Sequence, residues 1–175
     1  MSKEQLATEQ AARAAADKRA KEAMDKLAIA AALAVKEEPR GTVITLPGNV
    51  LFATNKAELL PAAQAKLAQI ADALKNQDDH AMVVEGHTDS QGTETSNLDL
   101  GQRRAQSVRD YLVSRGVSAD KISASGVGQG RPIADNTTVE GRAQNRRVEI
   151  VVQPIEKRRY VLARYNRLTG PFRPS

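Results

Sequence analysis

Apolar residues recur along the middle of the chain with the spacings of alternating strands and helices. The run Thr42–Leu46 predicts a strand, and the run Ala81–Val84 has the near-continuous hydrophobicity of a buried strand. Between them, Pro61 begins a predicted helix that runs to about Lys75, because proline in the first turn lacks only an N–H that has no helical partner. The apolar face of that helix consists of Ala63, Leu67, Ile70, Ala71 and Leu74.

The same alternation continues through the second half of the chain. A helix is expected over Asp99–Arg115, followed by strands at Ile122–Ser125 and Arg147–Val152, with a long polar loop over Gly126–Ala143 between the two strands. Strands separated by helices of this length predict an α/β fold (an α+β two-layer sandwich). We therefore expect a mixed, mostly parallel sheet packed on two helices.

Residues 1–38 have the composition of a single helix. Thirteen of these 38 residues are alanine, the best helix former, and the first proline is Pro39. Large apolar residues are sparse and charges of both signs alternate, as on a solvated helix face. Two interpretations stay open, a fraying helical arm or part of a coiled coil or stalk, because no heptad pattern runs long enough to decide.

The last residues form a third region with its own character. Residues 155–175 carry six basic residues against Glu156 alone, and Val161, Tyr165 and Leu168 fall on one face of a possible short helix. A basic amphipathic helix that docks on the domain or on a partner is the first interpretation; membrane-surface contact and a disordered tail are the alternatives. The chain thus divides into an arm (1–38), a domain (39–154) and a tail (155–175).

Composition and charge narrow the class of protein. Of the 175 residues, 41% are apolar and 27% are charged, which is typical of a globular domain, and aromatics are only 3%, so the core is expected to be aliphatic. The net charge of +5 comes entirely from the tail, since the arm carries seven charges of each sign and the domain thirteen of each. A nucleic-acid partner is disfavoured because the domain has no basic excess.

Several other classes of site are excluded or disfavoured by residues that the sequence lacks. There is no cysteine, so there is no disulfide or thiol chemistry, and with only two histidines a zinc site is not expected. No apolar run is long enough for a transmembrane span. The first residues carry no export signal, and we expect the natural protein to have a signal or lipoprotein sequence upstream of Met1.

The densest polar motif is Glu85–Ser90, directly after the predicted strand Ala81–Val84. In open α/β sheets, ligands bind at the carboxyl ends of strands. His87, Asp89 and Ser90 are too crowded for a catalytic triad, and a metal site lacks further ligands. A polar recognition loop with Asp89 as its charged group is the remaining interpretation. The glycines of Gly126–Gly130 precede Arg131-Pro132 rather than a helix, so a phosphate-binding loop is disfavoured.

Five motifs, in order and at the expected spacing, resemble the OmpA-like (outer-membrane protein A C-terminal) domain, which peptidoglycan-associated lipoproteins share. The similarity covers roughly residues 41–153. The resemblance implies a non-catalytic periplasmic domain that needs no cofactor and binds peptidoglycan through the diaminopimelate of its stem peptide. The motifs are Leu51-Phe-Ala-Thr-Asn55, Val84-Glu-Gly-His-Thr-Asp-Ser90, Asn97-x-x-Leu100-x-x-x-Arg104-Ala105-x-x-Val108, Pro132-Ile-Ala-Asp-Asn136 and Gly141-Arg-Ala-Gln-Asn-Arg-Arg-Val-Glu-Ile150.

The resemblance also assigns candidate ligand-binding residues. The free end of diaminopimelate carries one ammonium and one carboxylate on the same carbon, so its site needs an anion and a guanidinium a few ångström apart. By motif these are Asp89 and Arg104, and the planar fork of arginine suits a carboxylate. The further candidates are Asn97, Arg147, Asn55, Thr88 and Ser90.

One position departs from the family pattern. Gly101 stands where the family usually has serine after the leucine of the third motif, and glycine there is expected to weaken the helix start by up to ~1 kcal/mol.

The expected function is noncovalent binding of peptidoglycan that tethers the outer membrane or an envelope complex to the cell wall. The main alternative is an envelope interaction module whose arm and tail contact a protein partner. A cell-wall hydrolase is disfavoured because no metal cluster, Cys/His pair or spaced pair of catalytic carboxylates is present.

Overall fold

The computed structural model describes residues 2–31, 33–77 and 79–155. Five strands form one sheet in the order β1-β2-β5-β3-β4. Nearly all of the predicted basic tail, residues 156–175, lies outside the described residues. The strands are β1 (Ala34–Glu38), β2 (Gly41–Pro47), β3 (His80–His87), β4 (Ile122–Gly128) and β5 (Arg147–Pro154).

The sheet is mixed, as expected, but the expectation that it is mostly parallel is wrong. Only β3 and β4 pair in parallel, whereas β1–β2, β2–β5 and β5–β3 are antiparallel. The reason is that β1 and β2 form a hairpin, with Glu38 paired to Gly41, and that β5 inserts between β2 and β3. The one parallel pair needs a long crossover, which the helix between β3 and β4 supplies.

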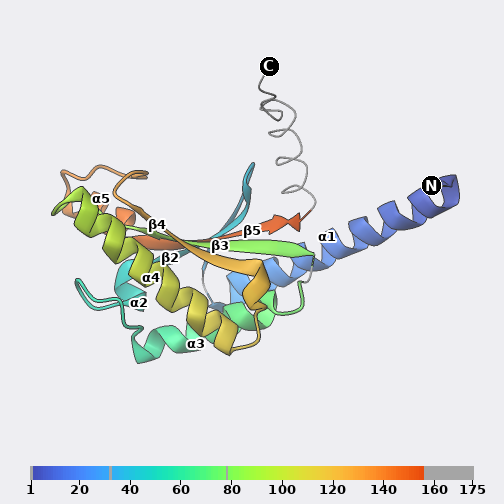
Figure 1. Ribbon diagram of the computed structural model, residues 1–175, viewed down its shortest axis with the longest axis horizontal. Coiled ribbons are helices and arrows are strands. Elements are labelled where there is room, and N and C mark those ends of the chain that lie inside the picture. The colour runs from blue at the N-terminus through green and yellow to red at the C-terminus, as the bar shows by residue number, and fades with distance from the viewer. Residues whose placement is uncertain (1, 32, 78, 156–175) are drawn as a thin grey trace, which may run out of the picture.

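Two long helices cover one face of this sheet. They are α3 (Pro61–Leu74), which has proline in its first turn as predicted, and α4 (Glu94–Ser114). Figure 1 shows both helices on the same side of the strands, so the architecture is a two-layer α/β sandwich. Shorter elements join the layers: α2 (Gly48–Leu51), a 3-10 turn (Ala119–Lys121) and α5 (Val139–Asn145).

The core lies between the two helices and the sheet and is almost wholly aliphatic. The side chains of Leu67, Val108, Val84 and Ile150 have no solvent exposure, and Phe52 is the aromatic exception. The predicted apolar face of α3 is buried in full. Aliphatic side chains fill the layer because the strands contribute every second residue to it and the helices every third or fourth.

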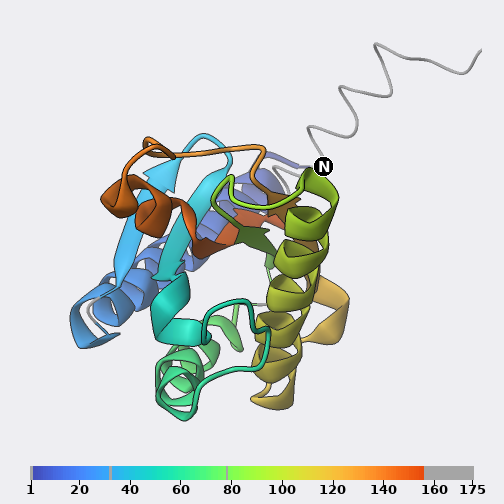
Figure 2. The same cartoon turned by 90° about the vertical axis from the view of Figure 1, so that its left-hand side faces the viewer.

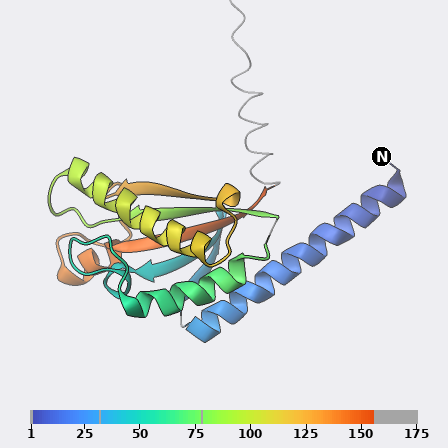
Figure 3. The ribbon, with the colours of Figure 1, turned by 60° about the horizontal axis from the view of Figure 1, so that its bottom comes forward.

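Helix α1 (Lys3–Ala31) forms an arm that extends away from the sheet (Figure 3). Its second half approaches α3, and Met24 is buried there, whereas most of its first half is exposed. The helix does not continue to residue 38 as predicted, because Ala34–Glu38 form strand β1. Pairing with β2 overrides the helical propensity of the alanine, lysine and glutamate residues in this segment.

Other boundaries shift by a few residues. Helix α4 begins at Glu94 rather than Asp99, with Thr93 as its N-cap, and its hydroxyl accepts the N–H of Ser96 at 3.1 Å. Helix α5 occupies part of the predicted long loop. Within the described ranges, no helix combines the length and the hydropathy that a membrane crossing requires.

Candidate ligand-binding site

A cavity of about 340 Å³ opens at the carboxyl end of β3. The β3–α4 loop, the first three turns of α4, α2 with the segment after it, and the residue before β5 contribute its walls, and Figure 2 shows these segments around one end of the sheet. Its position agrees with the general place of ligand sites in open α/β sheets. The cavity, here called the binding pocket, is lined by Gly48, Asn49, Phe52, Ala53, Thr54, Asn55, Thr88, Asp89, Gln91, Asn97, Leu100, Arg104 and Arg146.

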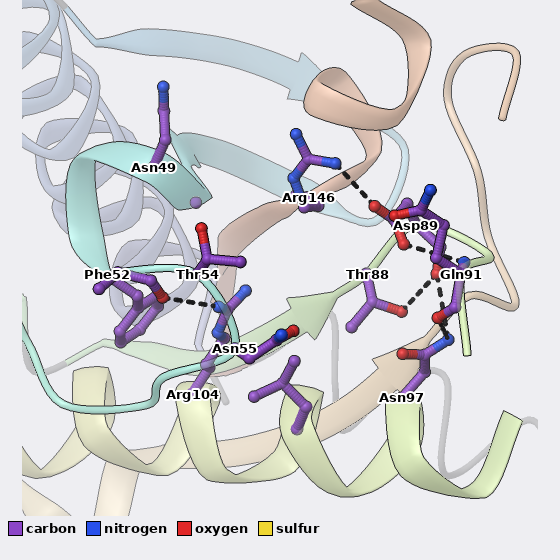
Figure 4. Close-up of a pocket in the computed structure, with 13 residues that line it drawn as sticks. Asn49, Phe52, Thr54, Asn55, Thr88, Asp89, Gln91, Asn97, Arg104 and Arg146 are labelled. Atoms are coloured by element: carbon purple, nitrogen blue, oxygen red, sulfur yellow. Dashed lines mark hydrogen bonds and ion pairs between the residues drawn. The ribbon is translucent and has the colours of Figure 1, made fainter. Parts of the chain in front are cut away.

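Asp89 is held firmly in one wall of the binding pocket. The residue is 6% exposed; its Oδ1 accepts the backbone N–H of Gln91 at 3.0 Å, and its Oδ2 accepts Nη1 of Arg146 at 2.7 Å. The carboxylate therefore has a fixed orientation, and its oxygens retain lone pairs for a further donor. Figure 4 shows Arg146 reaching toward Asp89.

The loop around Asp89 is braced by Thr88 and Asn97. The Thr88 N–H donates to the carbonyl of Gly128 on β4 at 2.9 Å, and its hydroxyl donates to the Asp89 carbonyl at 2.9 Å. The amide nitrogen of Asn97, from α4, donates to the carbonyls of Asp89 and Gln91 at 3.3 and 2.9 Å. These two side chains shape the loop through its backbone.

Arg104 forms the opposite wall, about two turns of α4 beyond Asn97. Its Nε donates to the carbonyl of Lys56 at 2.8 Å, and its guanidinium carbon lies 4.9 Å from the centre of the Phe52 ring. Although the residue is only 6% exposed, it makes no ion pair with any carboxylate in the described ranges. Burial, and then the nearby charges of Arg146 and Arg103, lower its pKa. Arg104 is thus a desolvated cation that faces the cavity without a carboxylate partner.

Asn55 lies on the loop that Arg104 anchors. It has a positive φ of 59°, a left-handed conformation that asparagine tolerates better than most residues. It lines the binding pocket, so its side chain amide is available to a ligand at the side of Arg104 (Figure 4).

The structure brings together five of the seven predicted site residues: Asp89, Arg104, Asn97, Asn55 and Thr88. Ser90 is exposed and does not line the cavity. Arg147 lies outside it, because its side chain points to the other face of the sheet, where Nε donates to Glu149 at 3.1 Å. Its neighbour Arg146 lines the cavity instead. The sequence shows that adjacent arginines at a strand start face opposite sides, but not which of them faces the ligand.

A second group of charges, here called the open-face ion cluster, occupies the sheet face away from the helices. Glu85 and Glu149 are directly opposite on β3 and β5, which would be destabilising for two like charges alone. Arg40, Arg131 and Arg147 surround them. The cluster consists of Arg40, Glu85, His87, Arg131, Arg147 and Glu149.

Every carboxylate oxygen in the open-face ion cluster already has a cationic partner. Glu85 accepts from Arg40 and Arg131, both at 2.7 Å, and Glu149 accepts from Arg40 at 2.9 Å and Arg147 at 3.1 Å. Burial would raise the pKa of Glu85, but nearby His87 and the hydrogen bonds from Arg131 and Arg40 hold it at about 2. Glu85, His87 and Glu149 are close enough to hold a metal ion, but guanidinium groups occupy the oxygens that it would need.

Comparisons with known proteins agree with this architecture. The family model described as "OmpA family" matches residues 51–146, and the chain belongs to this family. The peptidoglycan-binding protein ArfA of Mycobacterium tuberculosis is 48% identical over 105 residues, which are 60% of this chain and 32% of ArfA. The probable lipoprotein YiaD of Escherichia coli is 43% identical over 113 residues, 65% of this chain and 52% of YiaD. The chain therefore matches about half or less of these relatives.

Solved structures show the same fold. The cell wall anchor of the T6SS from Pseudomonas aeruginosa has a TM-score of 0.63 and 38% identity, covering 70% of this chain and 87% of that one. The peptidoglycan-associated lipoprotein from Burkholderia pseudomallei has a TM-score of 0.55 and 36% identity, covering 59% and 88%. The OmpA family domain that these comparisons identify in residues 51–146 is a binding domain rather than an enzyme domain, as expected from the sequence.

Proposed function

We propose that the protein binds peptidoglycan noncovalently through the free end of diaminopimelate in the stem peptide, and so tethers an envelope component to the cell wall. The observation that carries the proposal is the buried guanidinium of Arg104, which has no carboxylate partner in the described ranges and shares one cavity with Asp89. The names of ArfA, the cell wall anchor and the peptidoglycan-associated lipoprotein support the ligand class.

In this proposal the two charges of the diaminopimelate end are taken by opposite walls of the binding pocket. The ammonium donates to the carboxylate of Asp89, which still has lone pairs after its bonds with Gln91 and Arg146. The carboxylate accepts from the N–H groups of Arg104 that remain after Nε donates to the carbonyl of Lys56 and Nη2 to that of Ala53. Because Arg104 is fixed by the loop and by Phe52, little conformational freedom is lost on binding.

This pairing gives selectivity for diaminopimelate over lysine at the same stem position. Lysine carries the side-chain ammonium but no carboxylate beside it, so Asp89 would be satisfied while Arg104 stayed buried without a partner. Polar sites reject analogues that leave a buried group unpaired. Amidation of the diaminopimelate carboxylate should weaken binding less than its replacement by hydrogen, as in lysine, because an amide oxygen still accepts a hydrogen bond.

The location that follows is the periplasm, with association to the outer membrane, where the relatives named as outer membrane protein and lipoprotein belong. The alternative of a protein-interaction module also keeps one specific observation in its favour. The first half of α1 projects from the domain with exposed side chains, which would suit a partner helix. This role and wall binding are compatible in one chain.

The test is a calorimetric titration of the protein with matched stem peptides that carry diaminopimelate, amidated diaminopimelate or lysine. We expect Arg104→Gln and Asp89→Asn each to weaken diaminopimelate binding by ~2–5 kcal/mol. Arg103→Gln is the matched control, since it removes the same charge from the exposed side of α4, where Arg103 pairs with Asp99. Equal affinity for all three peptides would overturn the paired-charge account.

A further inference from the structure

A second cavity, of about 270 Å³, lies at the far end of β3 from the binding pocket. His80 begins β3 and Asp89 follows its end, so the length of this strand separates the two cavities. Figure 1 shows α1 passing this end of the sheet, beside the start of β3 and the end of β5. One wall of the cavity, here called the arm groove, comes from α1 through Asp17, Ala20, Lys21 and Met24.

The arm groove combines buried apolar side chains with polar atoms that lack partners. Met24 of α1 and Val152 of β5 are each 3% exposed. Nδ1 of His80, which is 7% exposed, and Oε1 of Gln77 have no hydrogen-bond partner among the described residues. Burial lowers the pKa of His80, although two nearby aspartates oppose this effect, so a neutral imidazole offers one acceptor nitrogen. The groove therefore fits a segment with apolar side chains and N–H or O–H donors.

Carboxylates also outnumber cations around this part of α1. A further cavity adjoins the arm groove between α1 and α3, and the two cavities share Ala20, Gln77 and His80. Together their linings hold four carboxylates and two cations, namely Asp17, Glu37, Asp72 and Asp79 against Arg19 and Lys21. Even with Lys75, which pairs with Asp72 from outside the lining, the carboxylates are in excess. The charge of this surface favours a basic occupant.

The chain itself continues from the wall of the arm groove with a segment of that chemistry. Pro154 lines the groove, and the N–H of Ile155 donates to the carbonyl of Asp79 at 2.8 Å, which fixes where the next residues begin. The 20 residues 156–175 carry six basic side chains against one acidic side chain. Their apolar side chains recur at helical spacing at Val161, Tyr165 and Leu168. Because this segment starts at the groove, docking there is intramolecular and needs no long linker.

We propose that residues 156–175 dock on the arm groove of the same molecule, with the ring of Tyr165 in the cavity, and so brace α1 against the domain. A cavity of about 150 Å³ holds a benzene-sized ligand. The arm groove, at about 270 Å³, therefore has room for a tyrosine ring and part of a neighbouring aliphatic side chain. The basic side chains of the segment supply donors for Gln77 and cations for the carboxylates around α1. The docked segment then sets the direction of the arm without contacting the binding pocket.

The chain has no tryptophan, so Tyr165→Trp gives it a single fluorescent reporter at the proposed contact. We expect acrylamide to quench this tryptophan about threefold less efficiently than in a synthetic peptide of residues 156–175 with the same substitution, because docking removes the ring from solvent. Ala20→Arg, which fills the groove with a long basic side chain, should raise the quenching to that of the peptide. Ala15→Arg is the matched control, since it places the same side chain at an exposed position of α1 and should leave the tryptophan protected.

Asp17→Lys tests the contribution of charge. It should raise the quenching partway, whereas Glu22→Lys makes the same change of charge on α1 outside the groove and should not. Circular dichroism checks that each variant keeps its helix content; should Ala20→Arg lose helix, the contrast between Asp17→Lys and Glu22→Lys decides.

The proposal is overturned if the tryptophan is quenched as readily in the chain as in the peptide, or if a folded Ala20→Arg variant leaves it protected. Protection that grows with protein concentration also overturns it, because the groove would then receive the segment from a second molecule.

Discussion

The binding pocket and the open-face ion cluster both use residues in or beside β3 and β5, yet they differ in how far their charges are satisfied. Glu85 lies in β3 and Asp89 just after it, and Arg146 and Arg147 are adjacent at the start of β5. In the cluster, all four carboxylate oxygens accept from guanidinium groups. In the pocket, Arg104 has no carboxylate partner among the residues that the structure describes, and Arg146 donates one hydrogen bond, to Asp89.

This difference distinguishes a structural charge network from the proposed binding site. A buried network in which every carboxylate oxygen is paired with a guanidinium stabilises one arrangement of the strands and leaves no carboxylate oxygen unpaired for a ligand. A buried guanidinium without a carboxylate destabilises the free protein, and a ligand carboxylate removes that cost on binding. The lack of a carboxylate partner among the described residues, rather than the residue type or the degree of burial, distinguishes Arg104 from Arg147, since both are at most 6% exposed.

The largest expected effect on the free energy of unfolding comes from replacing Arg147, the arginine of the pair Arg146-Arg147 that belongs to the open-face ion cluster. Arg147→Ala should lower the free energy of unfolding by ~3–5 kcal/mol, because it leaves Glu149 and two backbone carbonyls with unfilled acceptor sites in a buried region. Arg146→Ala should change it by less than ~1 kcal/mol, since its ion pair is at the rim. Urea denaturation of both variants measures the contrast. Equal destabilisation would remove the distinction between the two sites.

Much of the fold could be predicted from the sequence because periodicity and turn chemistry are local. The strands at residues 42–46, 81–84 and 147–152 and the helix from Pro61 lie where the pattern indicates. Strand β1 could not be found in this way, because Ala34–Glu38 has helical composition and becomes a strand only by pairing with β2. The mostly antiparallel pairing of the strands likewise depends on the insertion of β5 between β2 and β3. This insertion pairs strands that are far apart in the chain, so no short stretch of the sequence predicts it.

The candidate site is predicted through motifs, and the structure places five of the seven predicted residues around one pocket. Asp89 and Arg104 lie on opposite walls of one pocket, as the resemblance implied. The motif predicts Arg147 rather than Arg146 as a ligand-binding residue. A motif gives the residue types in order, but not the face of the sheet on which each side chain lies. Glu149, which pairs with Glu85, also holds the side chain of Arg147 on its face of the sheet. This pairing of the two glutamates is known only once the register of β3 and β5 is known.

Acid should remove the stability that the open-face ion cluster contributes, because its glutamates hold fewer protons in the folded protein than in the unfolded chain. The pKa of Glu85 is about 2 in the folded protein, below its ordinary value of 4.5, and that of Glu149 is also lowered. The unfolded chain therefore binds more protons in this window, so the stability that the pair contributes is complete above pH ~4.5 and is lost as the pH falls toward 2. For Glu85 alone the loss amounts to about 3 kcal/mol.

The measurement is the free energy of unfolding by urea at pH 7, 4.5 and 2.5. Glu85→Gln should flatten the dependence between the last two values, because glutamine does not titrate. Asp99→Asn is the control, since Asp99 forms an exposed ion pair with Arg103 and its loss should leave the slope unchanged. A slope that is the same in Glu85→Gln and in the wild type would show that other carboxylates govern acid unfolding.

The smallest of these effects concerns the helix that carries Arg104. Gly101 packs on the backbone of Gly86 in β3, and a Cβ added at Gly101 would lie only 2.5 Å from the Gly86 carbonyl oxygen. This contact gives a reason for the glycine that helix propensity alone does not, because the absence of a side chain lets α4 approach β3 closely. Arg104 lies one turn further along α4 and Asp89 shortly after the end of β3, so the approach helps to set the width of the binding pocket.

Gly101→Ser should therefore destabilise the protein by ~1–3 kcal/mol despite the better helix propensity of serine, because backbone must move to admit the side chain. The displacement of α4 should also weaken binding of the diaminopimelate peptide, while the preference over the lysine peptide persists, since both charged residues remain. Urea unfolding and calorimetry on the same preparation separate the two effects. If Gly101→Ser is more stable than the wild type and binds as tightly, the close approach does not constrain the pocket, and the low helix propensity of glycine destabilises α4 more than the serine side chain would.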